Sequence, residues 1–228
     1  MKKVFAFIFA RGGSRGLPRK NVLSLGGKPL IAHSIDVAKQ VQGIERIFVS
    51  TDDNEIKHIA KEFGAEVIDR PEELACNNAP EIEAWKHAIF YLKEKSEHFD
   101  IFLSLPATSP LRDKSDVIAC LEAMNKGTDV VITVTPATRN PYFNMVSRGK
   151  EGYSSILTPL NKYVRRQDAP QVYDMTTVAY VTRPEFISKH NGLFEGKVKS
   201  VVVPKERAID IDDIYDFKLA ELIFQENK

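Results

Sequence analysis

The sequence predicts an α/β protein: a three-layer sandwich with a mostly parallel central sheet. Short, continuously apolar runs alternate with amphipathic helical patterns from Val4 to Thr135, which is typical of parallel sheets covered by helices on both faces. In addition, 228 residues with 43% hydrophobic side chains suffice for one large core. We therefore expect a single domain over residues 1–228, with residues 137–172 as an excursion from the sheet.

In the first half of the chain, each element follows from a local pattern. The uninterrupted apolar run at the N-terminus is expected to be a buried strand. The next segment places Ile31, Ile35 and Ala38 on one helical face. A second helix ends before Gly64, because glycine suits the left-handed conformation after a helix. The expected elements are, in order, strand Val4–Phe9, helix Lys28–Val41, strand Arg46–Ser50, helix Asn54–Phe63 and strand Glu66–Ile68.

The second half continues this alternation and then departs from it. An apolar stripe marks a third helix, and the pattern then gives helix Glu81–Lys95, strand Ile101–Leu105, helix Ser115–Met124 and strand Val130–Thr135. Residues 137–172 show no helical period and contain several prolines, so we expect them to leave the sheet. The last expected elements are strand Thr176–Thr182, strand Ser200–Val203 and a helix from about Asp213 to Phe224.

Composition and charge exclude several classes of protein. The 32 basic and 31 acidic residues give a net charge of +1, which argues against a nucleic-acid or membrane partner. Cys76 and Cys120 form neither a disulfide framework nor a C-x-x-C metal site, so a reducing cytoplasmic location is expected. Arg11 ends the first apolar run, which is too short for a membrane span or a signal peptide.

The loop after the first strand concentrates positive charge. Residues 10–21 read ARGGSRGLPRKN, with three glycines, four cations and no acid. Glycines let backbone N–H groups converge on an anion, and arginine and lysine add charge-assisted hydrogen bonds. The loop follows a strand end, where open α/β sheets bind ligands. It therefore favours a nucleotide triphosphate, although it is neither a Walker A loop nor a G-x-G-x-x-G fingerprint; the alternative is a flexible, solvated loop.

Two aspartates near the C-terminus form a candidate metal site. On a strand, the spacing of Asp210 and Asp212 would place both carboxylates on one face, with Ile209 and Ile211 toward the core. Two carboxylates beside phosphates suit Mg²⁺. Alternatively, Asp212 is the N-cap of the last helix. The sequence pattern leaves both open. A second acidic pair, Asp52 and Asp53, follows the second strand, and we expect this pair to provide the N-cap of the next helix, aided by Glu55.

Five segments, in order along nearly the whole chain, resemble the acylneuraminate cytidylyltransferases, also called CMP-sialic acid synthetases. They are the glycine loop, Ile47–Asp52 (IFVSTD), Asp69–Ala75 (DRPEELA), Thr108–Arg112 (TSPLR) and Ile209–Asp212 (IDID). The resemblance implies a Rossmann-like nucleotidyltransferase fold, CTP as substrate, Mg²⁺ on Asp210 and Asp212, and a homodimer. It also implies that residues 137–172 carry dimer contacts and can lend a cation to the partner's active site.

The acceptor side of the chain departs from the sialic acid enzymes. Pro106 stands where they typically have glutamine, and Asp174 replaces an arginine. The stretches RNPYFN at 139–144 and RQDAPQVYDM at 166–175 are more similar to the CMP-legionaminic acid synthetase branch. Thr176 and Thr177 depart even from that branch.

These observations predict a cytidylyltransferase that joins CMP to a nine-carbon 3-deoxy-2-ulosonic acid of the legionaminic or sialic acid type and releases pyrophosphate. The expected catalytic residues are Arg11, Lys20 and Asp212. The expected nucleotide-binding residues are Arg11, Gly12, Gly13, Arg15, Lys20, Asn21 and Arg70, and the acceptor-binding residues are Asn144, Arg166, Gln167 and Tyr180.

Alternatives are a CMP-Kdo-type or other sugar nucleotidyltransferase, or a nucleotide-binding module without turnover. The sequence names no general base. We expect Arg112 to be a structural partner of Asp113 or Asp116 rather than a ligand contact.

Overall fold

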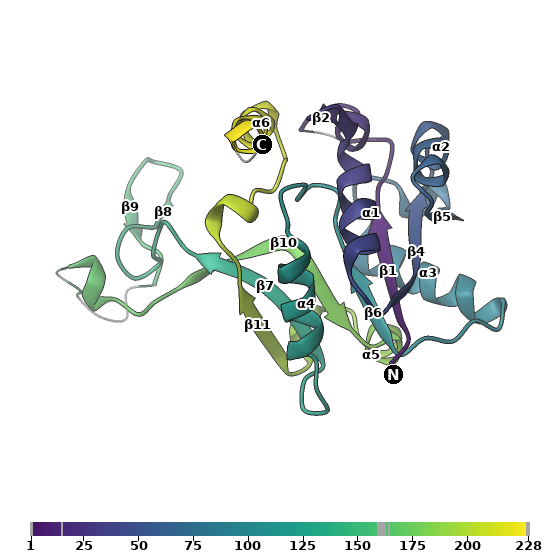
Figure 1. Cartoon of the computed structure of the whole chain (residues 1–228). Coiled ribbons are helices and arrows are strands. Elements are labelled where there is room, and N and C mark those ends of the chain that lie inside the picture. The colour runs from purple at the N-terminus through teal and green to yellow at the C-terminus, as the bar shows by residue number, and fades with distance from the viewer. Residues whose placement is uncertain (1, 15, 159–162, 164, 227–228) are drawn as a thin grey trace.

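The computed structural model describes residues 2–14, 16–158, 163 and 165–226, apart from the side chain of Arg166. Within these residues, a seven-stranded sheet has the order β11-β7-β10-β6-β1-β4-β5 (Figure 1). Its strands are β1 (Val4–Phe9), β4 (Ile44–Thr51), β5 (Glu66–Asp69), β6 (Ile101–Ser104), β7 (Val130–Pro136), β10 (Tyr173–Thr182) and β11 (Val198–Val202). β10 is antiparallel to β6 and β7, and the other pairs are parallel. This confirms the mostly parallel sheet.

Helices cover both faces of the sheet (Figure 1). They are α1 (Leu30–Gln40), α2 (Asn54–Glu62), α3 (Glu81–Glu94), α4 (Lys114–Ala123), α5 (Pro184–Lys189) and α6 (Ile214–Glu226). Alternation along β1 separates the two cores: Ala6 and Ile8 pack with α1, α2 and α4, whereas Phe5 and Phe7 pack with α3 and α5. The three-layer prediction is therefore confirmed, and α6 lies over a smaller third cluster around Leu25 and Ile211.

Short elements were missed or misplaced by the sequence patterns. The hairpin of β2 (Ser24–Leu25) and β3 (Lys28–Pro29) precedes α1, so the expected helix start at Lys28 is wrong; a residue before proline disfavours the helical conformation. α5 was not predicted, because its six residues are too few for a clear period. The described residues between Pro136 and Tyr173 include a separate hairpin of β8 (Val146–Arg148) and β9 (Ser154–Ile156) that does not join the main sheet.

Among the described residues, the segment that carries Asp210 and Asp212 belongs to no strand, so the strand on which the spacing argument depended is absent there. The predicted inward direction of Ile211 is nevertheless confirmed, because this residue is fully buried. Its N–H donates to the carbonyl oxygen of Thr108 at 2.8 Å. Asp213, rather than Asp212, caps α6: its carboxylate accepts from the backbone N–H groups of Tyr215 and Asp216. The capping alternative for Asp212 is therefore wrong.

Arg112 is buried and structural, as expected, but with different partners. It donates to the carbonyl oxygens of Val178 at 2.7 Å and Thr177 at 3.2 Å, to the Pro106 carbonyl oxygen and to the Ser34 hydroxyl. Burial lowers the pKa of its guanidinium to about 9. Asp116 pairs instead with Arg207 at 2.9 Å. Arg112 therefore ties the loop after β6 to β10. In the described part of the chain, no helix has the length and apolarity to cross a membrane.

Candidate active site

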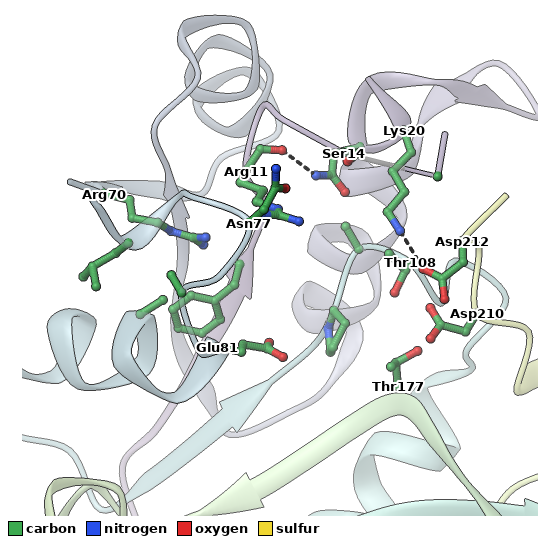
Figure 2. A pocket seen from close by; sticks show the side chains of 18 of the residues that line it. Arg11, Ser14, Lys20, Arg70, Asn77, Glu81, Thr108, Thr177, Asp210 and Asp212 are labelled. Carbon is green, nitrogen blue, oxygen red and sulfur yellow. Dashed lines mark hydrogen bonds and ion pairs between the residues drawn. The ribbon is translucent and has the colours of Figure 1, made fainter. Parts of the chain in front are cut away.

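A cavity of about 420 Å³ opens at the edge of the sheet where β1, β5 and β6 end. Of the residues predicted to bind nucleotide or metal, Arg11, Lys20, Asn21, Arg70, Asp210 and Asp212 line it. Figure 2 shows Arg11 and Arg70 on one side and Lys20, Asp210 and Asp212 on the other. Residues from opposite ends of the chain, such as Arg11 and Asp212, thus meet in one cavity, as expected for strand ends that share a sheet edge.

Hydrogen bonds within the glycine loop, to Cys76 and to Asp52 after β4 hold the loop in place. Asn21 Nδ2 donates to the carbonyl oxygen of Arg11 at 3.0 Å, and Arg11 Nη1 donates to that of Cys76 at 2.9 Å. The Gly12 N–H donates to Asp52 Oδ1 at 3.1 Å. Gly12 and Gly13 lie beside the cavity rather than on its wall, so their nucleotide role stays a prediction. Arg15 lies outside the described residues.

The loop also packs closely against the aspartate segment. A Cβ atom on Gly16 would lie 2.2 Å from the carbonyl oxygen of Asp212, so only glycine allows this approach. Lys20 Nζ donates to the carbonyl oxygen of Ile211 and to Asp212 Oδ1, both at 2.9 Å. The Lys20 side chain is 15% exposed and that of Asp212 77% exposed. The lysine is therefore fixed, whereas the carboxylate reaches the open cavity.

Arg70 and Arg19 have different roles. Arg70 is buried and donates to the hydroxyl and carbonyl oxygens of Ser50 at 3.1 and 2.7 Å; burial lowers the pKa of its guanidinium to about 10. Arg19 turns away and pairs with Asp53 and Glu55. Asp53 also accepts from the Ile56 N–H at 3.0 Å and caps α2, which confirms the N-cap prediction.

Asp210 is half-buried, and its Oδ1 atom is buried without a hydrogen-bond partner. Burial raises the pKa of its carboxyl above the ordinary value. The charge of Asp212 also raises this pKa, whereas hydrogen bonds with Thr108 and Thr177 lower it. An unpaired, buried carboxylate oxygen costs free energy of folding. Asp210 is therefore poorly explained as a stabilising residue.

Glu81, the first residue of α3, was not singled out by the sequence patterns. It lines the cavity (Figure 2) and accepts a hydrogen bond from Trp85 Nε1 at 3.2 Å. Glu81 is exposed to solvent at the cavity, and desolvation by the protein around its carboxyl raises the pKa of that group. Its only sequence signal was an acid at a helix start after a strand end. Ser14, Asn77, Thr108 and Thr177 are further lining residues without a predicted role.

Among the described side chains, the predicted acceptor residues Asn144, Gln167 and Tyr180 do not line this cavity. Tyr180 borders a second cavity of about 290 Å³ with Trp85, Met175 and Leu193, and this cavity shares Glu81 with the first. Gln167 lines a third, of about 460 Å³, at the base of the excursion. Asn144 is occupied locally, since its side-chain oxygen accepts from the Asn140 N–H at 2.7 Å. The side chain of Arg166 lies outside the described part of the structure.

Charge and shape limit what the main cavity can do. Arg11, Lys20 and Arg70 supply fixed positive charge on two sides, which suits a polyanionic ligand. The apolar wall formed by Phe9, Leu74 and Ala84 suits a flat, uncharged group. Over the described residues, histidine, cysteine and acidic side chains form no group of three that could bind a metal. A cation would therefore depend on the Asp210 and Asp212 pair together with ligand oxygens.

Comparisons with known proteins agree on one activity class. A family model described as cytidylyltransferase matches residues 5–217. A CMP-N,N'-diacetyllegionaminic acid synthase of Campylobacter jejuni is 30% identical over 98% of this chain and 95% of its own. An N-acylneuraminate cytidylyltransferase of Escherichia coli is 31% identical over 98% of this chain and 52% of its own. A solved CMP:2-keto-3-deoxy-manno-octonic acid synthetase complexed with CTP superposes with a TM-score of 0.73 at 19% identity, covering 99% of this chain and 100% of the other.

Proposed function

The chain belongs to the cytidylyltransferase family, and we propose that it transfers the CMP group of CTP to a nine-carbon 3-deoxy-2-ulosonic acid of the legionaminic or sialic acid type. The observation that carries this proposal is the single cavity in which Arg11 lies opposite Lys20, Asp210 and Asp212. The acceptor class rests on the names of the two relatives and on the legionaminic-type stretches of the excursion.

In the proposed reaction, the anomeric hydroxyl oxygen of the acceptor attacks the α-phosphorus of CTP. A new oxygen–phosphorus bond forms, the bond to the β-phosphate breaks, and pyrophosphate leaves with the bonding electron pair. Arg11 and Lys20 neutralise charge on the triphosphate, and Asn21 orients the nucleotide by holding the Arg11 backbone. Such sites act mainly by positioning and by charge stabilisation.

Asp210 and Asp212 would hold Mg²⁺. The buried Asp210 Oδ1 atom lacks a partner, and two carboxylates suit a cation that takes its remaining ligands from phosphates and water. The ion would polarise the α-phosphate. Lys20 already bonds Asp212, so it links the proposed metal position to the phosphate position.

Pyrophosphate release tests the proposal. The protein is mixed with CTP, Mg²⁺ and, in turn, N-acetylneuraminate, legionaminate, Kdn, pseudaminate and Kdo. We expect release with a legionaminic or sialic acid type acceptor and none without an acceptor. Release with Kdo alone would replace the proposed acceptor class. CTP binding without release for any acid would favour a nucleotide-binding module without turnover.

We further propose a homodimer formed through the excursion. Four apolar side chains between 145 and 157 are exposed there: Met145 (39%), Val146 (57%), Tyr153 (81%) and Leu157 (52%). A patch of this kind marks an interaction surface, and the third cavity beside it contains Arg139 and Gln167, which could face the partner's active site. Two free cysteines, Cys76 and Cys120, fit a cytoplasmic location.

A charge placed in the patch tests the dimer. We expect the unmodified protein to have twice the mass of one chain by light scattering and Leu157→Asp to have the mass of one. Phe90→Asp is the control, because Phe90 is similarly exposed, at 58%, but lies on α3. Equal masses for both variants and the unmodified protein would argue against an interface at the excursion.

A further inference from the structure

Glu81 lies at the boundary between the nucleotide cavity and the cavity that contains Tyr180. It is the one residue that lines both the nucleotide cavity and the cavity that Tyr180 borders, among the described residues. This inference presupposes the proposed function and assigns CTP to the first cavity and the acceptor to the second, because the predicted acceptor residue Tyr180 borders the second cavity. The acceptor hydroxyl must then pass close to the boundary between them.

From this position we propose that Glu81 is the general base of the reaction. Its carboxylate removes the proton of the acceptor's anomeric hydroxyl as that oxygen bonds to the α-phosphorus of CTP. The oxygen–hydrogen bond breaks, the proton stays on Glu81, and pyrophosphate leaves. The carboxylic acid then releases the proton to water. Atoms and charges balance without another reactant.

Local contacts orient the Glu81 carboxylate. Trp85 Nε1 donates to its Oε1 atom at 3.2 Å, and the spacing of four residues on α3 places the two side chains on one helical face. Trp85 is itself buried and packs against Phe102 and Tyr180. Figure 2 shows the Glu81 carboxylate directed into the cavity, between the side of Arg70 and the side of Asp210. A base held in this way needs little reorganisation before proton transfer.

The electrostatic surroundings also suit a base. Desolvation and the charge of Asp210 raise the pKa of the Glu81 carboxyl, whereas the hydrogen bond from Trp85 and the charge of Arg70 lower it, and the net direction is upward. Tyr180 is the other titratable neighbour. A carboxylate with a raised pKa accepts a proton more readily near neutral pH than an ordinary one. The Asp210 and Asp212 carboxylates are less available for this role, because the proposed metal would occupy them.

The test compares Glu81→Gln with Glu83→Gln. Glutamine keeps the shape of the side chain and an acceptor for Trp85, and Glu83 lies in the same helix turn, where it pairs with Lys86. We expect Glu81→Gln to lower the single-turnover rate of CMP-sugar formation by about a hundredfold to ten-thousandfold. The CTP dissociation constant should change by less than about threefold, and Glu83→Gln should match the unmodified protein.

The pH dependence of the rate distinguishes a general base from a structural residue, because a structural residue would not change it. The rate should fall as pH drops through the pKa of Glu81, and this acidic limb should disappear in Glu81→Gln and persist in Glu81→Asp. A Glu81→Gln rate within tenfold of the unmodified protein would overturn the inference, as would an unchanged limb. A matching loss of CTP affinity would make Glu81 a nucleotide-binding group instead. If the unmodified protein forms no product with any acid, the proposed function fails as well.

Discussion

Asp210→Asn is expected to lower kcat/KM by about a thousandfold or more, which corresponds to about 4 kcal/mol of transition-state stabilisation. Asparagine keeps the shape of the side chain but removes the charge that would hold Mg²⁺. Thermal stability should stay the same or rise. The folded state raises the pKa of this carboxyl by burying it, so at neutral pH the charged form opposes folding, and a neutral side chain removes that penalty. Pyrophosphate release against Mg²⁺ concentration and a melting curve provide the two measurements.

Asp213→Ala is the matched control for this result. Asp213 caps α6 through the N–H groups of Tyr215 and Asp216, and loss of such a cap costs about 1 kcal/mol. We expect this variant to melt earlier and to keep its activity per folded molecule. If Asp210→Asn instead loses stability and retains activity, Asp210 is a structural residue and the proposed metal site fails.

Arg11→Ala is expected to have the second largest effect, a loss of about a hundredfold to a thousandfold in kcat/KM with the fold retained. The guanidinium lies on the cavity wall opposite Lys20 and is anchored to the Cys76 carbonyl oxygen. Its loss removes both a charge for the triphosphate and a link between the glycine loop and residue 76. Steady-state kinetics with CTP as the varied substrate provide the measurement, and a melting curve checks the fold.

Arg19→Ala separates this effect from a general loss of positive charge in the loop. Arg19 belongs to the same loop, but its guanidinium pairs with Asp53 and Glu55 beside α2, and such an exposed pair is worth about 1 kcal/mol or less. We expect near-normal kinetics for this variant. Similar losses in Arg11→Ala and Arg19→Ala would indicate that the loop attracts nucleotide by its overall charge and that Arg11 has no specific contact.

Long apolar runs predicted most of the fold, because burial on both faces leaves a signal that needs no knowledge of partners. The family resemblance drawn from the motifs is confirmed by the family match and the relatives. The sequence patterns did not predict short elements such as α5 and the β2–β3 hairpin, because helices of six residues and strands of two are too short to show a period. The Asp210–Asp212 alternation was right about Ile211 but wrong about a strand, because alternation does not reveal whether a neighbouring strand exists.

The candidate site likewise contains some residues that the sequence predicted and others that it did not. Arg11 and Lys20 came from the charge and glycines of the loop after β1, and Arg70 from its place after a strand. The two aspartates came from their spacing and the family resemblance, and the structure brings all five residues to one cavity. Glu81 was not predicted, because an acid at a helix start reads as an ordinary helix residue. Thr177 lines the cavity and lies within a register irregularity of β10 between Thr176 and Tyr180. No local pattern foretells such an irregularity.

The strand order has a consequence for how the molecule assembles. β10 lies between β6 and β7, although it follows both in the chain, and β7 pairs only with β10 and β11 among the described strands. Residues 4–105 can therefore form a four-stranded half-sheet during synthesis, whereas β7 must wait for β10. Asp210 and Asp212 arrive later still. The nucleotide cavity is thus completed after the sheet, because a chain that ends before Asp210 would contain all seven strands of the main sheet and still lack both aspartates.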